Sequence, residues 1–135
     1  MKVIAGEALG ARAVIETHTP IVYQDWTVRP GADVTVPIDA KQQVLVYVFG
    51  GAVKVGDDAR EVRDGELAVL AHGNTVRLRG VDGEARLLLL AGEPLREPVA
   101  RYGPFVMNRE REIHQAIRDY QTGRMGEITR TARVD

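Results

Sequence analysis

Short β-prone runs separated by turn signals are the feature that most constrains how this chain can fold. About eight such runs follow one another at intervals of roughly 8 to 12 residues, and a single helical stretch comes after them. The most β-prone run, residues 44–49, is apolar at every position, so we expect it to be a central strand. The pattern predicts an all-β protein, a two-layered sandwich or barrel with one carboxy-terminal α-helix.

Turn residues mark the ends of these runs. Pro30 and Gly31 suit the two central positions of a type II turn. Asp82 and Gly83 form a strong hairpin signal, and residues 86–90 after them are short and apolar enough to be a buried strand. Residues 13–15 near the amino terminus are also predicted to be a strand.

A proline-rich segment and an aromatic segment follow the strand at residues 86–90. Pro94 and Pro98 remove backbone donors and fix φ, so residues 92–99 are neither helix nor central strand. We expect the aromatic segment to lie over apolar surface with its large side chains buried, as a strap fixed to the core. The residues that we assign to this strap and to an associated interface are Tyr102, Phe105, Met107, Ile113, Ile117 and Tyr120.

An amphipathic helix is predicted over residues 109–121. Asn108 is a favourable N-cap, and Gly123 is well placed to end the helix. Residues 124–135 lack hydrophobic periodicity and are expected to form a flexible tail. The apolar positions recur at the spacing of one helix face, which is formed by Ile113, Ala116, Ile117 and Tyr120.

Composition excludes several classes of function. The chain has 135 residues and a formal charge of −1, which suits one domain and does not favour nucleic acid as a partner. It has no cysteine and no serine, so disulfides, thiolate chemistry and a serine nucleophile are excluded. The amino terminus lacks a secretory signal, and residues 44–49 are too short to span a bilayer. We therefore expect a cytoplasmic protein with no membrane contact.

Several stretches resemble the pirin family of the cupin superfamily. The likeness rests on GEPLREPV at residues 92–99, YGPFVMN at 102–108 and DYQTG at 119–123, and it extends back to residues 4–7 and 17–21. It covers nearly the whole chain, but only the carboxy-terminal half of a typical pirin. It implies a cupin-like domain over residues 1–123, which includes the helix.

The resemblance also implies where a cofactor belongs. Pirins are two-domain cupins whose amino-terminal domain carries iron. A quercetin 2,3-dioxygenase-like activity and redox-responsive transcriptional co-regulation are attributed to the family. For this chain, the resemblance therefore implies that iron and catalysis lie in an amino-terminal domain that the sequence lacks.

The two metal-binding motifs of cupins can be compared with this chain position by position. Their scaffold glycines are kept, as Gly31 and Gly50 in the first motif and as Gly65 in the second. A mononuclear iron or manganese site needs several imidazole or carboxylate donors. We therefore expect no metal, no cofactor and no catalytic residue in this chain. The positions of the four ligands are occupied by Pro37, Asp39, Gln43 and Val76.

The three histidines receive no catalytic role. Glu16 and His18 point the same way in a strand and could supply two ligands, but no third donor is suggested by spacing. His72 is expected to lie in a turn. His114 lies outside the apolar face of the helix and is expected to be exposed.

Two classes of function remain open. The chain is either a metal-free structural or interaction module, or part of a pirin-type quercetin 2,3-dioxygenase whose iron lies in a missing domain. A third possibility, a binding module that uses the barrel interior, requires a roomy cavity there. The expected partner is a second copy or another cupin domain, since the helix and the apolar segment around Val14 and Ile15 need covering. No small-molecule ligand is indicated.

Overall fold

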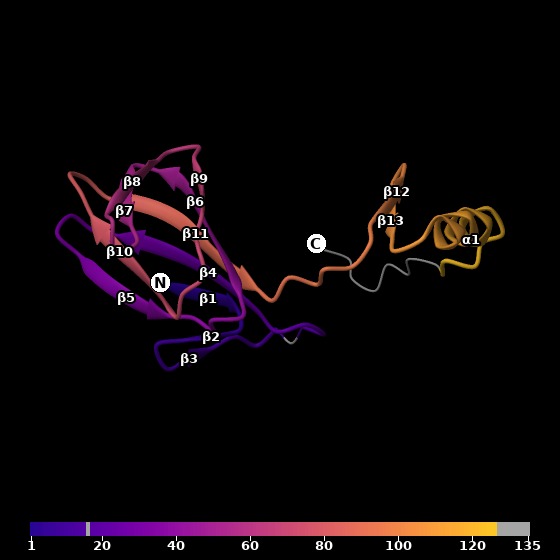
Figure 1. Cartoon of the computed structure of the whole chain (residues 1–135), viewed down its shortest axis with the longest axis horizontal. Helices are drawn as coiled ribbons and strands as arrows, with labels where there is room; N and C mark the ends of the chain where they lie inside the picture. Colours follow the sequence, from indigo (N-terminus) through magenta and orange to yellow (C-terminus); the bar gives the residue numbers. More distant parts are fainter. Residues whose placement is uncertain (16, 127–135) are drawn as a thin grey trace, which may run out of the picture. The chain divides into compact units, whose positions relative to one another are not determined.

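The computed structural model describes residues 1–15 and 17–126. They form strands and a single helix, which confirms the all-β fold class with one carboxy-terminal helix. The chain divides into two compact units, Met1–Pro94 and Leu95–Asp135 (Figure 1). The predicted domain over residues 1–123 spans both units, and most of the predicted tail lies outside the described residues.

The first unit is a sandwich of two antiparallel sheets. The five-stranded sheet has the order β1-β4-β11-β6-β9, and the four-stranded sheet has the order β5-β10-β7-β8. The strands of the larger sheet are β1 (Lys2–Ala5), β4 (Ile21–Val28), β11 (Ala85–Gly92), β6 (Gln43–Gly50) and β9 (Leu67–Val69). The strands of the smaller sheet are β5 (Asp33–Pro37), β10 (Thr75–Gly80), β7 (Ala52–Val55) and β8 (Arg60–Arg63).

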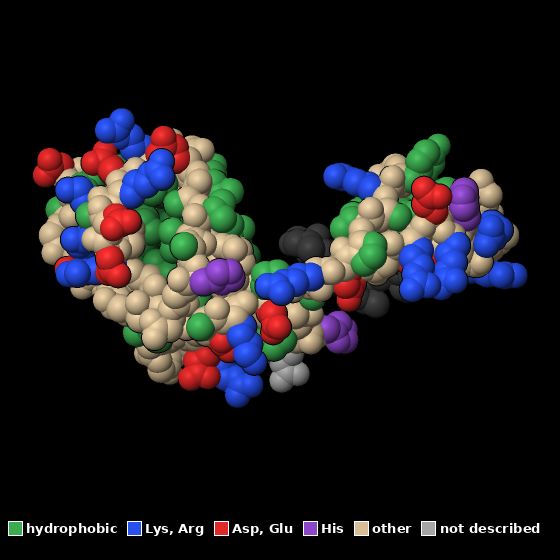
Figure 2. All heavy atoms as spheres, in the orientation of Figure 1, with side chains coloured by type: hydrophobic (Ala, Val, Ile, Leu, Met, Phe, Trp, Pro, Cys, Tyr) green, Lys and Arg blue, Asp and Glu red, His purple; other side chains and the backbone are tan. Residues whose placement is uncertain are grey.

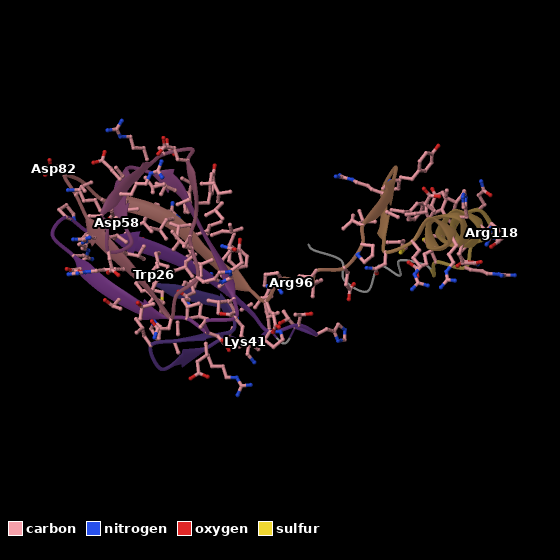
Figure 3. The ribbon with its side chains drawn as sticks, viewed as in Figure 1. Trp26, Lys41, Asp58, Asp82, Arg96 and Arg118 are labelled. Carbon is pink, nitrogen blue, oxygen red and sulfur yellow. The ribbon has the colours of Figure 1, made fainter. Side chains whose placement is uncertain are left out.

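Alternating side chains place one face of each sheet in the core. The inner residues of β4, β6 and β11 pack against those of β5, β7 and β10, as period-two alternation requires. Figure 3 shows Trp26 of β4 between the two sheets. The strand β6 lies inside its sheet, as predicted for residues 44–49, and β11 is the middle strand of the same sheet. Only one face of each lies in this core. The fully buried side chains include Val36, Val46, Val48, Val53, Leu78, Leu87 and Leu89.

Consecutive strands mostly belong to different sheets. The turn at Asp82 and Gly83 joins β10 of the smaller sheet to β11 of the larger one, so the prediction of a hairpin there is wrong. A turn signal reports that the chain reverses, whereas the partner of each strand is chosen by core burial. The predicted type II turn is confirmed, because the Ala32 N–H donates to the Arg29 carbonyl at 3.1 Å and Gly31 has φ +72°.

The amino-terminal strand prediction is wrong for residues 13–15. The chain instead forms a small hairpin of β2 (Glu7–Ala8) and β3 (Ala11–Arg12), and Ile15 makes an isolated bridge to Ala5. Val14 is 97% exposed. Ile15 pairs with the edge strand β1 at one position only, and a single bridge does not make a strand.

The second unit is a hairpin packed on a helix. The helix α1 (Glu110–Gln121) contacts both β12 (Ala100–Tyr102) and β13 (Phe105–Met107). Ile113 and Ala116 are buried, so this part of the predicted apolar face is confirmed. The prediction that Tyr102 is buried is wrong, since it is 68% exposed. Phe105 and Met107 are half-buried, and their role with the helix residues as an interface stays a prediction.

The N-cap of α1 is Arg109, so the assignment of Asn108 is wrong by one residue. The Asn108 side chain instead donates to the Glu97 carboxylate at 2.7 Å. The Glu112 carboxylate accepts the backbone N–H groups of Arg109 and Asn108, at 2.9 and 3.1 Å, which satisfies the start of the helix. Gly123 ends the helix as predicted, with φ +71°.

Within residues 1–15 and 17–126, no helix has both the length and the hydropathy that crossing a membrane requires.

We expect Gly80→Ala to destabilise the sandwich by about 3 kcal/mol. A Cβ on Gly80 would lie 2.0 Å from the carbonyl oxygen of Arg29, and this backbone cannot move aside while the Gly80 N–H donates to Ala32 at 2.8 Å. Urea unfolding followed by the fluorescence of Trp26, the one tryptophan, measures the loss. Gly73→Ala is the matched control, because its nearest neighbour would be 3.9 Å away. Equal losses in both variants would contradict the steric argument.

Candidate functional site

Two of the four cupin ligand positions carry a polar side chain, Asp39 and Gln43. Each of these side chains forms a hydrogen bond to the nearby backbone. Asp39 is exposed beyond the end of β5, and its Oδ1 accepts the backbone N–H of Lys41 at 2.9 Å. Gln43 begins β6, and its Nε2 donates to the backbone carbonyl of Leu70 at 2.6 Å. Each polar side chain therefore stabilises a nearby turn or strand end.

The other two ligand positions carry no donor at all. Pro37 ends β5 and pairs with Thr75, and its ring is exposed. Val76 lies on the inner face of β10 and belongs to the buried core. One carboxylate and one amide do not fit iron, which needs several converging imidazole or carboxylate ligands. In the part of the chain that the structure describes, no three His, Asp or Glu side chains come together as a metal site.

The three histidines lie on the surface of the protein. His18, His72 and His114 are all exposed. Glu16, which was paired with His18 in the sequence, lies outside the described residues.

The interior of the sandwich is lined by apolar side chains, and a hollow of about 460 Å³ beside β8 and β9 is lined by Val55, Val62 and Ala68 among others. Branched aliphatic residues occupy the inner face of each central strand. The buried polar side chain among them is Gln24, whose Oε1 accepts the Trp26 indole N–H at 2.7 Å. Its Nε2 has no protein partner within the described residues. This pair fixes Trp26 in the core and offers no donor set for a metal.

The outer faces of the two sheets differ sharply in character. The outer face of the four-stranded sheet is charged, as expected for a surface in water. The Arg77 Nε donates to Asp33 at 2.8 Å, and this hydrogen bond lowers the pKa of the Asp33 carboxyl. Arg63 pairs with Glu61 at 2.9 Å, and this pair raises the pKa of Arg63. These exposed groups describe an ordinary solvated sheet face.

The outer face of the five-stranded sheet is apolar instead. Two neighbouring rows of residues cross strands β4, β11, β6 and β9 in register. Tyr47, Leu67 and Val69 are 37%, 54% and 65% exposed, so this surface is open in the single chain. We call it the apolar sheet face. One row consists of Tyr23, Leu90, Leu45 and Val69, and the other consists of Leu88, Tyr47 and Leu67 and continues on β4 to Asp25.

Figure 2 shows this contrast within the sandwich. Hydrophobic side chains gather along its right-hand border, on the side of β6 and β9. Charged side chains gather along its left-hand border, over β5 and β10. A hollow of about 300 Å³, lined by Leu45, Leu90 and Ile21 among others, indents one end of the apolar sheet face.

A charged rim lies at the other end of the apolar sheet face. The Arg86 guanidinium stacks over the ring of Phe49, 4.6 Å from its centre. The same group lies 3.9 Å from the Asp25 carboxylate. An apolar centre with a balanced polar rim is typical of protein–protein interfaces.

A separate groove lies within the second unit. It has a volume of about 750 Å³ and runs between the β12–β13 hairpin and α1. Tyr102, Ile113 and Ile117 line it together with the charged Arg101 and Arg109. Three of the predicted interface residues thus share one surface.

The sequence analysis missed the apolar sheet face. A signal for it was present, because residues 44–49 and 86–90 are apolar at nearly every position. A strand in a two-layered sandwich has only one core face. Apolar side chains on both faces therefore mark an outer face that needs covering, a step that the sequence analysis did not take.

Known proteins resemble this chain over most of its length. Residues 23–126 match the Pirin C-terminal cupin domain. Human pirin is 42% identical over 127 residues, which cover 92% of this chain and 44% of that protein. A protein of Vibrio cholerae named putative quercetin 2,3-dioxygenase is 39% identical over 108 residues, 80% of this chain and 37% of that one.

A solved structure shows the same fold. The crystal structure of quercetin 2,3-dioxygenase from Acinetobacter baumannii matches 94% of this chain and 44% of its own, with a TM-score of 0.83 and 35% identity. The chain spans less than half the length of the curated relatives named above. The predicted resemblance is thereby confirmed, and the chain belongs to the pirin family through its carboxy-terminal cupin domain.

Proposed function

We propose that this chain is a metal-free interaction module of the pirin family, without catalysis of its own. The observation that carries the proposal is the contrast between the two outer sheet faces. One is charged and solvated, whereas the other presents Tyr47, Leu67 and Val69 to water. An exposed apolar patch of more than a few hundred Å² usually marks an interface. Its partner is a second copy of the chain or another cupin domain.

The chemistry of the cupin ligand positions supports the same proposal. Asp39 and Gln43 are engaged in local hydrogen bonds, and Val76 is part of the core. To bind iron here, the protein would need imidazole or carboxylate groups where it has a proline, an amide and a valine. The sandwich thus serves packing and association.

A second candidate function follows from the names of the relatives. Two of the proteins that this chain resembles are named as quercetin 2,3-dioxygenases, at 39% and 35% identity. In this alternative, the chain is part of such an enzyme and another domain holds the iron. The contribution of this chain would then be to pack against the iron-bearing domain, because its own residues do not fit the metal.

We expect the purified chain to hold far less than one iron or manganese ion per molecule. The reason is the donor set at residues 37, 39, 43 and 76, with its single carboxylate. Elemental analysis after growth in medium supplemented with both metals checks this. Asp39→Ala is the control and should not change the metal content. One ion per chain, lost in Asp39→Ala, would show that a metal site exists.

We expect the chain by itself not to oxidise quercetin. Oxygen chemistry on a flavonol needs a redox metal or another cofactor, and this chain offers no ligand set for a redox metal. Oxygen uptake with quercetin should equal that of a boiled sample, while the Acinetobacter baumannii enzyme serves as the positive control. Uptake that survives chelator treatment and repurification would contradict the proposal. Activity that appears only with an added iron-bearing pirin domain would favour the second candidate.

A further inference from the structure

We propose that Asp82 is a modification site, at which the peptide bond between Asp82 and Gly83 rearranges spontaneously to an isoaspartyl linkage. The site lies in a connection of the first unit and is independent of the proposed function, because the apolar sheet face takes no part in it. The rearrangement is singled out by a contrast between two copies of one tripeptide in this chain.

The tripeptide Asp-Gly-Glu occurs at residues 64–66 and again at residues 82–84. Both aspartates and both glycines are exposed, so water reaches the two copies equally well. Both glycines have a positive φ, +81° at Gly65 and +101° at Gly83. The two copies thus share their reacting groups and the residue that follows them, and they differ in how the fold holds them.

The reaction needs only these groups and water. The backbone nitrogen of Gly83 attacks Cγ of Asp82, and the hydroxyl of the carboxylic acid leaves with the amide proton as water. In the resulting succinimide ring, water breaks either the new C–N bond, which restores aspartate, or the original peptide bond. The second outcome leaves the chain linked through Cγ and frees the α-carboxylate. Glycine permits the attack because it has no Cβ beside the nitrogen.

Hydrogen bonds hold the first copy in place. The Gly65 N–H, the group that would attack, donates to the Val48 carbonyl at 2.9 Å. The Asp64 N–H donates to the Gly51 carbonyl, also at 2.9 Å. Before the nitrogen of Gly65 can approach the Asp64 side chain, this turn has to open. Because the lost hydrogen bonds raise the barrier, the fold protects the first copy.

The second copy has no such restraint. Asp82 and Gly83 lie in the connection from β10 to β11, and Figure 3 places Asp82 at the periphery of the sandwich. Within the described part of the chain, the N–H groups of these two residues donate to no backbone carbonyl. The nitrogen of Gly83 can therefore turn towards the Asp82 side chain without breaking a main-chain hydrogen bond.

The flanking residues confine this freedom to the connection. The Gly80 N–H donates to the Ala32 carbonyl at 2.8 Å, which fixes the end of β10. Ala85 is fully buried in the core, which fixes the start of β11. We therefore expect the sandwich to stay folded when the isoaspartyl linkage lengthens the main chain at residue 82.

Ageing of the full chain at neutral pH, followed by mass spectrometry, tests the proposal. Trypsin releases residues 64–77 and 80–86, so each Asp–Gly pair lies in its own peptide. Electron-transfer fragmentation distinguishes isoaspartate from aspartate, and a sample digested before ageing corrects for isomerisation during digestion. Isoaspartate should accumulate at Asp82 at least about tenfold faster than at Asp64, because opening the first turn costs hydrogen bonds.

The same chain aged in urea is the matched control. Unfolding removes the hydrogen bonds at both copies, so the two rates should become similar. The fluorescence of buried Trp26 reports that the sample aged without urea keeps its sandwich core. Asp82→Asn and Asp64→Asn form the same succinimide with loss of ammonia and react faster, because an amide is a better electrophile than a carboxylate. The Asp82→Asn chain should again react faster than the Asp64→Asn chain.

Two results would overturn the proposal. The first is equal rates at the two copies in the folded chain, which would mean that exposure alone decides the reaction. The second is an absence of isoaspartate at residue 82 in the folded chain, whether or not the urea sample forms it. Neither result bears on the interaction module, which the metal and quercetin experiments test separately.

Discussion

Burial of branched aliphatic side chains between the two sheets is the interaction on which the rest of the structure depends. Leu87, Leu89 and Leu78 are fully buried, and each contributes about 1.5–3 kcal/mol by leaving water. This core also decides what the fold can do. Val76 lies where a cupin motif expects a histidine, and it is part of the packed interior.

The outer surfaces of the two sheets differ in character. Both outer sheet faces are in contact with water, but their side chains differ. The outward side chains of β10 include Arg77 and Arg79, whereas those of β6 include Leu45 and Tyr47. Solubility favours the first arrangement, and the second has a cost unless another surface covers it. The groove between α1 and its hairpin adds a second partly apolar surface, with Tyr102 beside it.

Local signals were reliable where a single turn or helix end settles the structure. The type II turn at Pro30 and Gly31 and the end of α1 at Gly123 were predicted correctly, because φ and one or two nearby hydrogen bonds decide them. Prediction failed where two neighbouring residues could both form the N-cap, and where residues distant in the chain determine which strands pair. Asn108 is not the N-cap, because its side chain donates a hydrogen bond to Glu97, eleven residues away in the chain. The Asp82–Gly83 turn was recognised, but its two strands entered different sheets.

The sequence by itself determined the fold class, the family and the lack of an iron ligand set in the cupin motifs, since these follow from residue spacing and side-chain chemistry. Only the tertiary structure decided which apolar residues face the core and which face water. Residues 87–90 are all leucine, yet Leu87 and Leu89 lie inside while Leu88 and Leu90 lie outside. The physical reason is that side chains alternate along a strand, and the face that becomes the core is chosen by the opposite sheet, whose strands are distant in the chain.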